Sequence, residues 1–137
     1  NTNILMLKFM SMVQRSGHLF NNHQVRLTES HQAQKTSVPG TAVSLAQALG
    51  VPVDAVESVR SVPAQRERLQ VPQAHLARHA VHEVVIEDGL CSVRLESRVY
   101  GEAPYAHGVG QIVAAVLAHP LQPRCYNVME FVEQGWL

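Results

Sequence analysis

The chain has 137 residues, the size of one domain with a single hydrophobic core. Eleven basic and eleven acidic side chains cancel, and neither sign forms a long run, which argues against nucleic acid or an anionic membrane surface as the partner. We therefore expect the partner to be a small molecule or another copy of the chain.

An apolar helix is predicted to begin after Thr2 or Asn3 and to end at Gly17, since the first two are suitable N-caps and glycine is a common C-terminal stop. Apolar residues surround most of this helix, so we expect it to be covered on two sides. It is either a central core helix or a helix in contact with another domain or subunit.

The same segment is too short and too polar for a membrane span, because Lys8 and Ser11 interrupt it. It also lacks the positive charge and the cleavage site of a signal peptide, so a cytoplasmic protein is expected. The chain begins at Asn1 instead of methionine and enters the apolar helix almost at once, which suggests a segment cut from a longer protein.

A strand is predicted over residues 25–30, where two sets of residues alternate with a period of two. One face carries Val25, Leu27 and Glu29, and the other carries Arg26, Thr28 and Ser30. His31 then emerges at the end of this strand, on the same face as Leu27 and Glu29, with its ring toward the following loop.

A site for a small anion is predicted where this loop meets the next helix. Pro39 and Gly40 break the chain, and Thr41 is expected to be the N-cap of a short amphipathic helix that ends at Gly50. A carboxylate would bind the Gly40 and Thr41 amides, with Lys35 as its counter-charge. His31 beside that anion would donate a proton.

Residues 55–62 form a weak predicted strand ended by Pro63, and a long loop follows over residues 65–80. His75, His79 and His82 in this region have the spacing to begin a metal site on a helix. The glutamate of a HExxH motif is missing and no cysteine is close by, so the pattern favours polar loop histidines and no metal.

The clearest strands, residues 81–87 and 91–99, are joined by Asp88-Gly89, a pair typical of a tight hairpin turn. The second strand has one apolar and one charged face. A strong helix over residues 109–117, ended by Pro120, is expected to pack on the sheet. Cys91 and Cys125 lack a CxxC spacing and are expected to be buried free thiols in a reducing compartment.

The run Glu29-x-His31-x-x-x-Lys35, followed by Pro39-Gly40-Thr41-Ala42, resembles the catalytic segment of the 4-hydroxy-tetrahydrodipicolinate (dihydrodipicolinate) reductases. The pattern of that family is E-x-H-H-x-x-K-x-D-A-P-S-G-T-A. The resemblance implies that His31 is the proton-donating histidine and Lys35 the catalytic lysine. It also implies that Gly40 and Thr41 bind the substrate carboxylate.

The resemblance extends over nearly the whole chain through the order of its elements. Tyr105-Ala106-His107-Gly108 is similar to the F-A-x-G segment that opens the last family helix, and Tyr126–Phe131 is similar to the terminal tail. His82 could match a family histidine that stands just before a strand. The chain departs from the family where Gln32 replaces the second histidine, where Ser37 and Val38 replace Asp-Ala, where the serine before Gly40 is missing, and where Glu102 aligns with an arginine.

The resemblance implies an α+β fold, a mixed β-sheet with helices packed on one face. Residues 1–137 would be a single substrate-binding and oligomerisation domain of a cytoplasmic homotetramer or dimer that acts in lysine biosynthesis by the diaminopimelate pathway. No G-x-G-x-x-G follows a strand, so the N-terminal Rossmann domain of the family is apparently absent from this chain. NADPH or NADH would be bound mainly by that other domain.

The function predicted first is therefore the substrate-binding and catalytic half of an NAD(P)H-dependent reductase that acts on a small cyclic or conjugated carboxylate. Two alternatives stay open. The chain is a stand-alone domain that binds a small carboxylate or transfers protons without redox chemistry, or it is an oligomerisation module in which His31 and Lys35 are ordinary surface residues.

Overall fold

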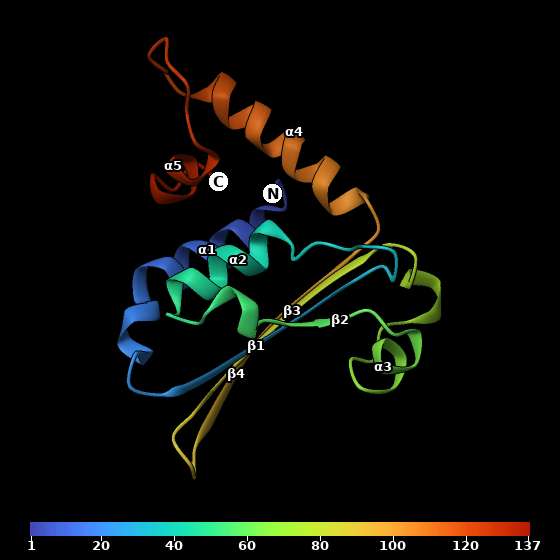
Figure 1. Cartoon of the computed structure of the whole chain (residues 1–137). Coiled ribbons are helices and arrows are strands. Elements are labelled where there is room, and N and C mark those ends of the chain that lie inside the picture. The colour runs from blue at the N-terminus through green and yellow to red at the C-terminus, as the bar shows by residue number, and fades with distance from the viewer.

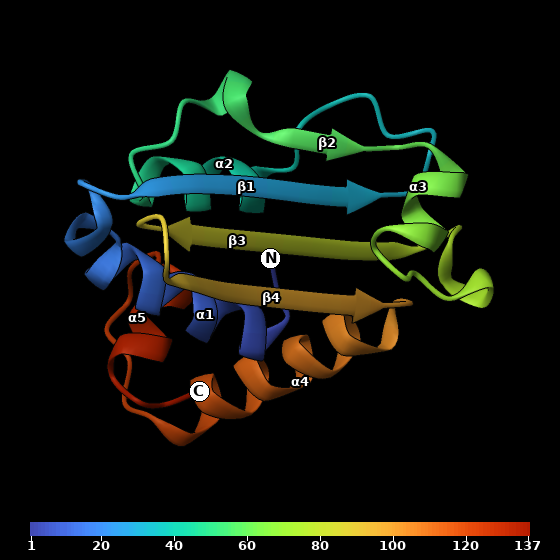
Figure 2. The ribbon, with the colours of Figure 1, turned by 90° about the horizontal axis from the view of Figure 1, so that it is seen from below.

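A four-stranded mixed sheet forms the centre of the molecule in the computed structural model, which describes all 137 residues (Figures 1 and 2). Its strands are β1 (Gln24–His31), β2 (Glu57–Val59), β3 (His79–Glu87) and β4 (Ser92–Tyr100), in the spatial order β2-β1-β3-β4. β1 pairs in parallel with β2 and antiparallel with β3, which pairs antiparallel with β4. The predicted α+β fold is confirmed.

Two helices cover one face of the sheet, namely α1 (Ile4–Ser16) and α2 (Gly40–Ala48) (Figure 1). The predicted N-cap of α1 is confirmed, since Asn3 Oδ1 accepts a hydrogen bond of 2.8 Å from the Met6 amide. The main core lies between these helices and the sheet, and removal of its apolar side chains from water stabilises the arrangement. It contains Met6, Met10, Val13, Leu27, Ala42, Leu45, Ala46, Leu49, Val56, Val84 and Ile86.

α1 has partners on more than one side, as its composition indicated. It packs on the sheet, on α2 and on the short helix α5 (Val128–Glu133). Asn127 begins α5 with a capping box, and Trp136 docks beyond its end against Phe131 and His119. A remaining strip of α1 faces outward, where Leu5 is 78% exposed.

The strand predicted over residues 55–62 is shorter, Glu57–Val59, and the helix α3 (Val62–Glu67) begins at its predicted end, with Pro63 in the first turn, and runs into the predicted loop. The segment that follows contributes Leu69 and Val71 to a second, smaller core, where they pack on Val59 and Val81. This small core lies on the sheet face opposite α1 and α2, because residue parity along β3 separates Val81 from the main-core residue Val84.

The rest of that opposite face is charged. Its arginine and glutamate side chains form the pairs Arg26–Glu87, Arg68–Glu57, Arg94–Glu83 and Arg98–Glu96. The prediction of one apolar and one charged face on β4 agrees with this arrangement. No helix of the chain is both long enough and apolar enough to cross a membrane.

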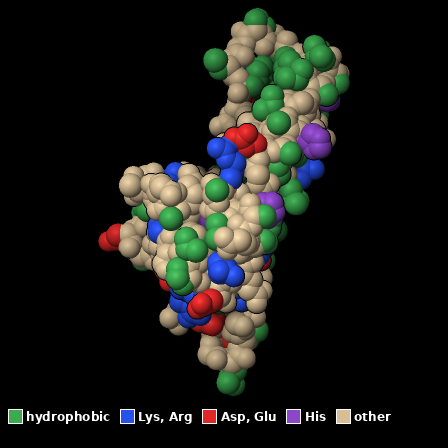
Figure 3. Space-filling view, turned by 90° about the vertical axis from the view of Figure 1, so that its right-hand side faces the viewer, with side chains coloured by type: hydrophobic (Ala, Val, Ile, Leu, Met, Phe, Trp, Pro, Cys, Tyr) green, Lys and Arg blue, Asp and Glu red, His purple; other side chains and the backbone are tan.

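The helix α4 (Ala103–Ala118) differs from the prediction in its position. It does not pack on the sheet but projects from the body, and Figure 3 shows hydrophobic side chains gathered on this upper part of the molecule. Val113 is 52% exposed and Leu117 is 82% exposed. The physical reason is that α1 and α2 already cover the apolar face, while Gly101, at a φ of +73°, turns the chain away at the end of β4.

Three smaller predictions are wrong. Thr41 is not the N-cap of α2, because the helix begins at Gly40, two residues before the predicted Ala42, with Pro39 as an N-cap that makes no side-chain bond. Cys91 and Cys125 are free but exposed instead of buried, since one lies in the turn after β3 and the other in the tail after α4. His82 lies within β3, not just before it.

Candidate functional site

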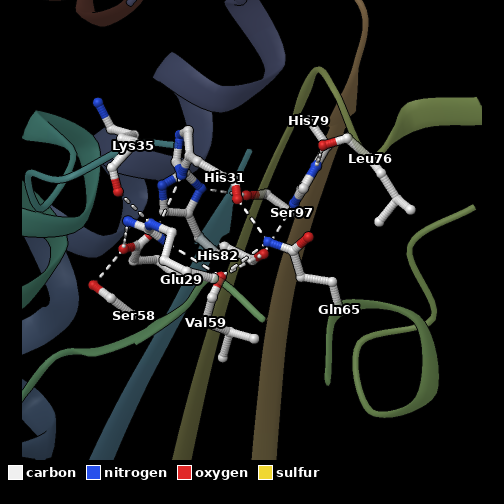
Figure 4. A network of polar contacts seen from close by, with 12 residues as sticks. Glu29, His31, Lys35, Ser58, Val59, Gln65, Leu76, His79, His82 and Ser97 are labelled. Atoms are coloured by element: carbon white, nitrogen blue, oxygen red, sulfur yellow. Dashed lines mark hydrogen bonds and ion pairs between the residues drawn. The ribbon is translucent and has the colours of Figure 1, made fainter. Parts of the chain in front are cut away.

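A fully buried carboxylate, Glu29 of β1, is the centre of a polar network (Figure 4). The Ser58 hydroxyl donates to Oε1 at 2.5 Å, and Arg60 donates to both carboxylate oxygens, at 2.5 and 3.1 Å. Burial by itself would raise the pKa of Glu29, but the hydrogen bonds from His31, Arg60 and Ser58 lower it to about 2. Glu29 is therefore ionised throughout the neutral range.

His31 lies at the end of β1, where the sequence predicted it, and its ring contacts Glu29. The distance from His31 Nδ1 to Glu29 Oε2 is 2.9 Å. An ionised carboxylate only accepts hydrogen bonds, so Nδ1 carries a proton and Nε2 is the nitrogen left to exchange one. A carboxylate that fixes the tautomer of a histidine in this way is a common arrangement in general acid–base sites.

His82 packs edge-on against the His31 ring, with the two ring centroids 5.6 Å apart. It is opposite Glu29 in the pairing of β1 with β3, and it is 3% exposed. Burial and the nearby His31 lower the pKa of His82 to about 4, and its Nε2 has no hydrogen-bond partner. A neutral imidazole therefore forms one wall of the site at neutral pH.

His79 lies on the opposite face of β3 from His82 and is also buried. Its Nδ1 faces the carbonyl oxygens of His75 and Leu76, so this nitrogen carries the proton, and its Nε2 lies 2.9 Å from Ser30 Oγ. Burial lowers the pKa of His79. Ser30 Oγ also donates to the Val59 carbonyl oxygen, at 3.0 Å, and Gln65 Nε2 donates to the same oxygen, at 3.1 Å.

Lys35 belongs to the same network through its main chain. Its carbonyl oxygen accepts a hydrogen bond of 2.8 Å from Arg60 Nε, while its own amide donates to the Gln32 carbonyl. The ammonium group makes no ion pair with an acidic side chain. Lys35 therefore joins the network through its carbonyl oxygen, whereas its ammonium group has no ion pair and points away from Glu29 (Figure 4).

A pocket of about 450 Å³ opens beside His31. His79 of β3 and Tyr105 of α4 also line it, together with Arg78 and Glu102, which form an ion pair with each other. Burial raises the pKa of Tyr105, so its hydroxyl stays protonated. Glu102 lies in this pocket with a cation already beside it, so it does not present an unpaired negative charge to a ligand.

Gly40 and Thr41 lie at the start of α2 and do not line this pocket. The first amides of a helix have no partner within it, so those of Gly40 and Thr41 remain available to an anion. The Thr41 hydroxyl accepts a hydrogen bond of 3.2 Å from the Asn1 side chain. The polar network therefore joins His31 to the main chain of Lys35, which does not line the pocket, whereas Gly40 and Thr41 form a separate donor group.

The three histidines weighed as metal ligands do not converge. His75 stacks on Tyr100, His79 bonds Ser30, and His82 lies on the other sheet face against His31. No group of three or more histidine, cysteine, aspartate or glutamate side chains has a spacing suited to a metal ion.

Arg60 and Ser58 were missed as site residues, although a signal was present. Both belong to the weak strand pattern of residues 55–62, on the same face as Val56. A glutamate on the buried face of β1 requires a cation, and only the parallel pairing of Glu29 with Ser58 identifies which cation reaches it.

Comparison with curated proteins finds four plant reductases. The chain is 30% identical over 126 residues to "4-hydroxy-tetrahydrodipicolinate reductase 1, chloroplastic" from Arabidopsis thaliana. This match covers 85% of this chain and 36% of that protein. It is 30% identical over 128 residues to the probable reductase 1 of rice (Oryza sativa subsp. japonica), covering 85% of this chain and 37% of that protein. The chain thus spans about a third of the length of the curated relatives it matches.

Comparison with solved structures finds a dihydrodipicolinate reductase from Paenisporosarcina sp. TG-14 with dipicolinate bound. The TM-score is 0.54 at 20% sequence identity, and the match covers 84% of this chain and 46% of that chain. At this identity the likeness supports the fold alone. No protein-family model matches the sequence.

Proposed function

Because the chain is a divergent relative of the 4-hydroxy-tetrahydrodipicolinate reductases, we propose that it is the substrate-binding and catalytic half of an NAD(P)H-dependent reductase. The substrate class is a small cyclic or conjugated carboxylate. The observation that carries the proposal is the buried Glu29–His31 pair, which leaves His31 Nε2 to transfer a proton, with His31 lining a pocket.

Each proposed role follows from a contact. His31 supplies a proton from Nε2, while Glu29 holds the ring in the required tautomer and stabilises it when charged. The free ammonium group of Lys35 offsets the negative charge of the bound carboxylate, and the Gly40 and Thr41 amides donate hydrogen bonds to the same or a second carboxylate group. These four are the substrate-binding and catalytic residues of the proposal.

We propose that the dinucleotide binds to another domain. Gly108 and Gly110 lie inside α4 instead of in a turn between a strand and a helix, and the sheet has only one parallel pair. NADPH or NADH bound by another domain would supply the hydride. The uncharged helix α4 leaves apolar side chains exposed, which supports contact of this helix with another domain or subunit.

The wider setting is part of the same proposal. The names of the relatives describe reductases of 4-hydroxy-tetrahydrodipicolinate, and we propose a role for this chain in lysine biosynthesis. The plant relatives are named chloroplastic, so the cytoplasmic location proposed for this chain does not come from them. Gln32, Ser37 and Glu102 depart from the family pattern, which favours a related carboxylate over the usual one. The charged open face of the sheet supports assembly into a homo-oligomer, as a dimer or a tetramer, since its paired charges would meet those of a second copy.

The carboxylate site is tested by titrating dipicolinate into the chain and measuring the heat of binding. We expect Lys35→Ala to weaken binding by roughly tenfold through loss of the counter-charge, and Lys8→Ala, on the outer side of α1, to leave it unchanged. Absence of dipicolinate binding by the unaltered chain would contradict the site.

The catalytic half of the proposal needs the complete gene product. Its intact mass in a fresh cell extract, compared with the 15.1 kDa of this chain, shows whether residues for a cofactor domain are present. In an NAD(P)H oxidation assay of that product, we expect His31→Ala and Lys35→Ala to abolish most turnover. Unchanged turnover in both would contradict their assignment.

A second candidate is a stand-alone domain that binds a small carboxylate or transfers protons without redox chemistry. The observation that favours it is the lack of a dinucleotide turn anywhere in the chain. In that case the intact mass equals that of the present chain and dipicolinate still binds. If dipicolinate does not bind, the third reading, an oligomerisation module, takes first place, and sedimentation analysis would show the oligomer.

A further inference from the structure

Arg60 contacts both halves of the candidate site with one guanidinium group. Its Nη1 and Nη2 donate to the two carboxylate oxygens of Glu29, at 3.1 and 2.5 Å. Its Nε donates to the carbonyl oxygen of Lys35, at 2.8 Å. The Arg60 guanidinium therefore joins the end of β1 to the loop that precedes α2.

The two partners of Arg60 control different catalytic groups. Glu29 accepts the hydrogen bond from His31 Nδ1, so the position and charge of this carboxylate set the tautomer of the ring. The Lys35 carbonyl fixes the main chain from which the ammonium side chain extends. Arg60 itself has a side chain that is 20% exposed, and it is not among the residues that line the pocket beside His31.

We propose that Arg60 is a positioning residue that aligns His31 and Lys35 with each other, through Glu29 on one side and the Lys35 main chain on the other. This inference rests on the proposed function for the roles of His31 and Lys35. It adds the reason why two groups on different segments keep a fixed relative position in the absence of a direct contact.

Arginine is required for this arrangement because of its shape. The planar guanidinium directs a pair of N–H groups at one carboxylate and a third N–H elsewhere, whereas the lysine ammonium is a point charge at the end of a flexible chain. Lysine at position 60 can neutralise Glu29 but cannot also hold the Lys35 carbonyl. A lysine variant therefore separates the two functions of the side chain.

The experiment compares Arg60→Lys and Arg60→Gln with the unaltered chain by NMR. Imidazole nitrogen shifts report the tautomer of His31, and amide hydrogen exchange at Lys35, whose N–H donates to the Gln32 carbonyl, reports the order of the loop. Arg68→Gln is the matched control. Arg68 also pairs with a glutamate of the sheet, Glu57 of β2, but contacts neither His31 nor Lys35.

We expect Arg60→Lys to keep the Nδ1–H tautomer of His31 and to accelerate exchange at Lys35 by roughly tenfold. Arg60→Gln should accelerate this exchange and also give a mixture of His31 tautomers, and Arg68→Gln should change neither. Unaltered Lys35 exchange in Arg60→Lys would overturn the proposal, as would the same changes in Arg68→Gln. If Arg60→Gln fails to fold, the Arg60→Lys result alone decides.

Neither readout depends on turnover or on a ligand, so the two proposals fail separately. If the Arg60 variants show neither the faster Lys35 exchange nor the mixed His31 tautomers, while dipicolinate still binds, the positioning role is excluded and the proposed function remains. The expected NMR effects without dipicolinate binding would leave the arrangement of Arg60 intact and overturn the function proposed for the groups it holds.

Discussion

Oε2 of Glu29 lies 2.9 Å from Nδ1 of His31, and this carboxylate has no exposed surface. The pair is a charged group and a titratable ring held at the edge between a packed core and a pocket. The contribution of this pair to the free energy of unfolding can be measured independently of any reaction.

Replacement of Glu29 by Gln is expected to destabilise the chain by about 3 kcal/mol at pH 7, because it leaves the Arg60 guanidinium without its counter-ion. The pKa of Glu29 is lowered from 4.5 to about 2, so this carboxylate stabilises the fold above pH 4.5 and loses that effect as the pH falls toward 2. Urea unfolding across this range should therefore show a weaker pH dependence in the variant. Glu57→Gln is the control, with an expected cost below about 1 kcal/mol for a half-exposed pair.

Replacement of His82 by Phe is expected to remove part of the acid sensitivity of the chain. The folded state keeps His82 neutral down to a pKa of about 4, mainly because it is buried, whereas the unfolded chain takes up a proton near 6.5. His82 therefore costs the unaltered chain up to about 3 kcal/mol of stability as the pH falls from 6.5 to 4. The pKa of His79 is also lowered, so His79 adds to this loss of stability at acid pH in the unaltered chain and in the Phe variant alike.

Thermal unfolding between pH 4 and 7 measures this effect. At pH 7 the Phe variant should be at least as stable as the parent, since His82 Nε2 has no partner to lose. An unchanged pH dependence between 6.5 and 4 would show that His82 is accessible to protons in the folded chain.

The anion site at α2 can be tested by removal of a single N–H group. Gly40 is the first helical residue, where proline is tolerated, and an added Cβ there meets no atom within 4 Å. Gly40→Pro should therefore preserve the helix and weaken dipicolinate binding by roughly tenfold through loss of one charge-assisted bond. Gly40→Ala, which keeps the N–H, should bind as the parent does; equal affinity of the two variants would exclude the Gly40 amide.

Replacement by alanine should have opposite effects on stability at two glycines of α4. An added Cβ at Gly108 would lie 1.6 Å from the Thr2 carbonyl oxygen, so Gly108→Ala must displace the N-terminal segment, at a cost of about 1 to 3 kcal/mol. Gly110 has no atom within 4 Å, and Gly110→Ala should add up to about 1 kcal/mol from helix propensity. Urea unfolding of both variants checks the contact between α4 and the start of the chain, and equal stabilities would show that it does not form.

The local patterns of the sequence were sufficient for most elements. Asn3 and Gly17 bound the first helix, the alternation over residues 25–30 gives β1 and the face of His31, and Asp88-Gly89 joins β3 to β4. These features depend on backbone preference and on the spacing of apolar side chains, which are properties of neighbouring residues. The motif around His31 and Lys35 was visible for the same reason.

Other features depended on residues that are distant in the sequence. The projection of α4 depends on which face of the sheet remains uncovered after α1 and α2 have packed. The cation beside Glu29 depends on the parallel pairing of β1 with β2.

The sequence by itself therefore determined the strand that carries Glu29 and His31, the mixed α+β character of the chain and the loop that contains Lys35. Only the tertiary structure decided that Arg60, 31 residues after Glu29, neutralises this carboxylate and also holds the Lys35 carbonyl. The physical reason is that a buried charge selects its partner by distance in space, and strand register sets that distance once the chain has folded.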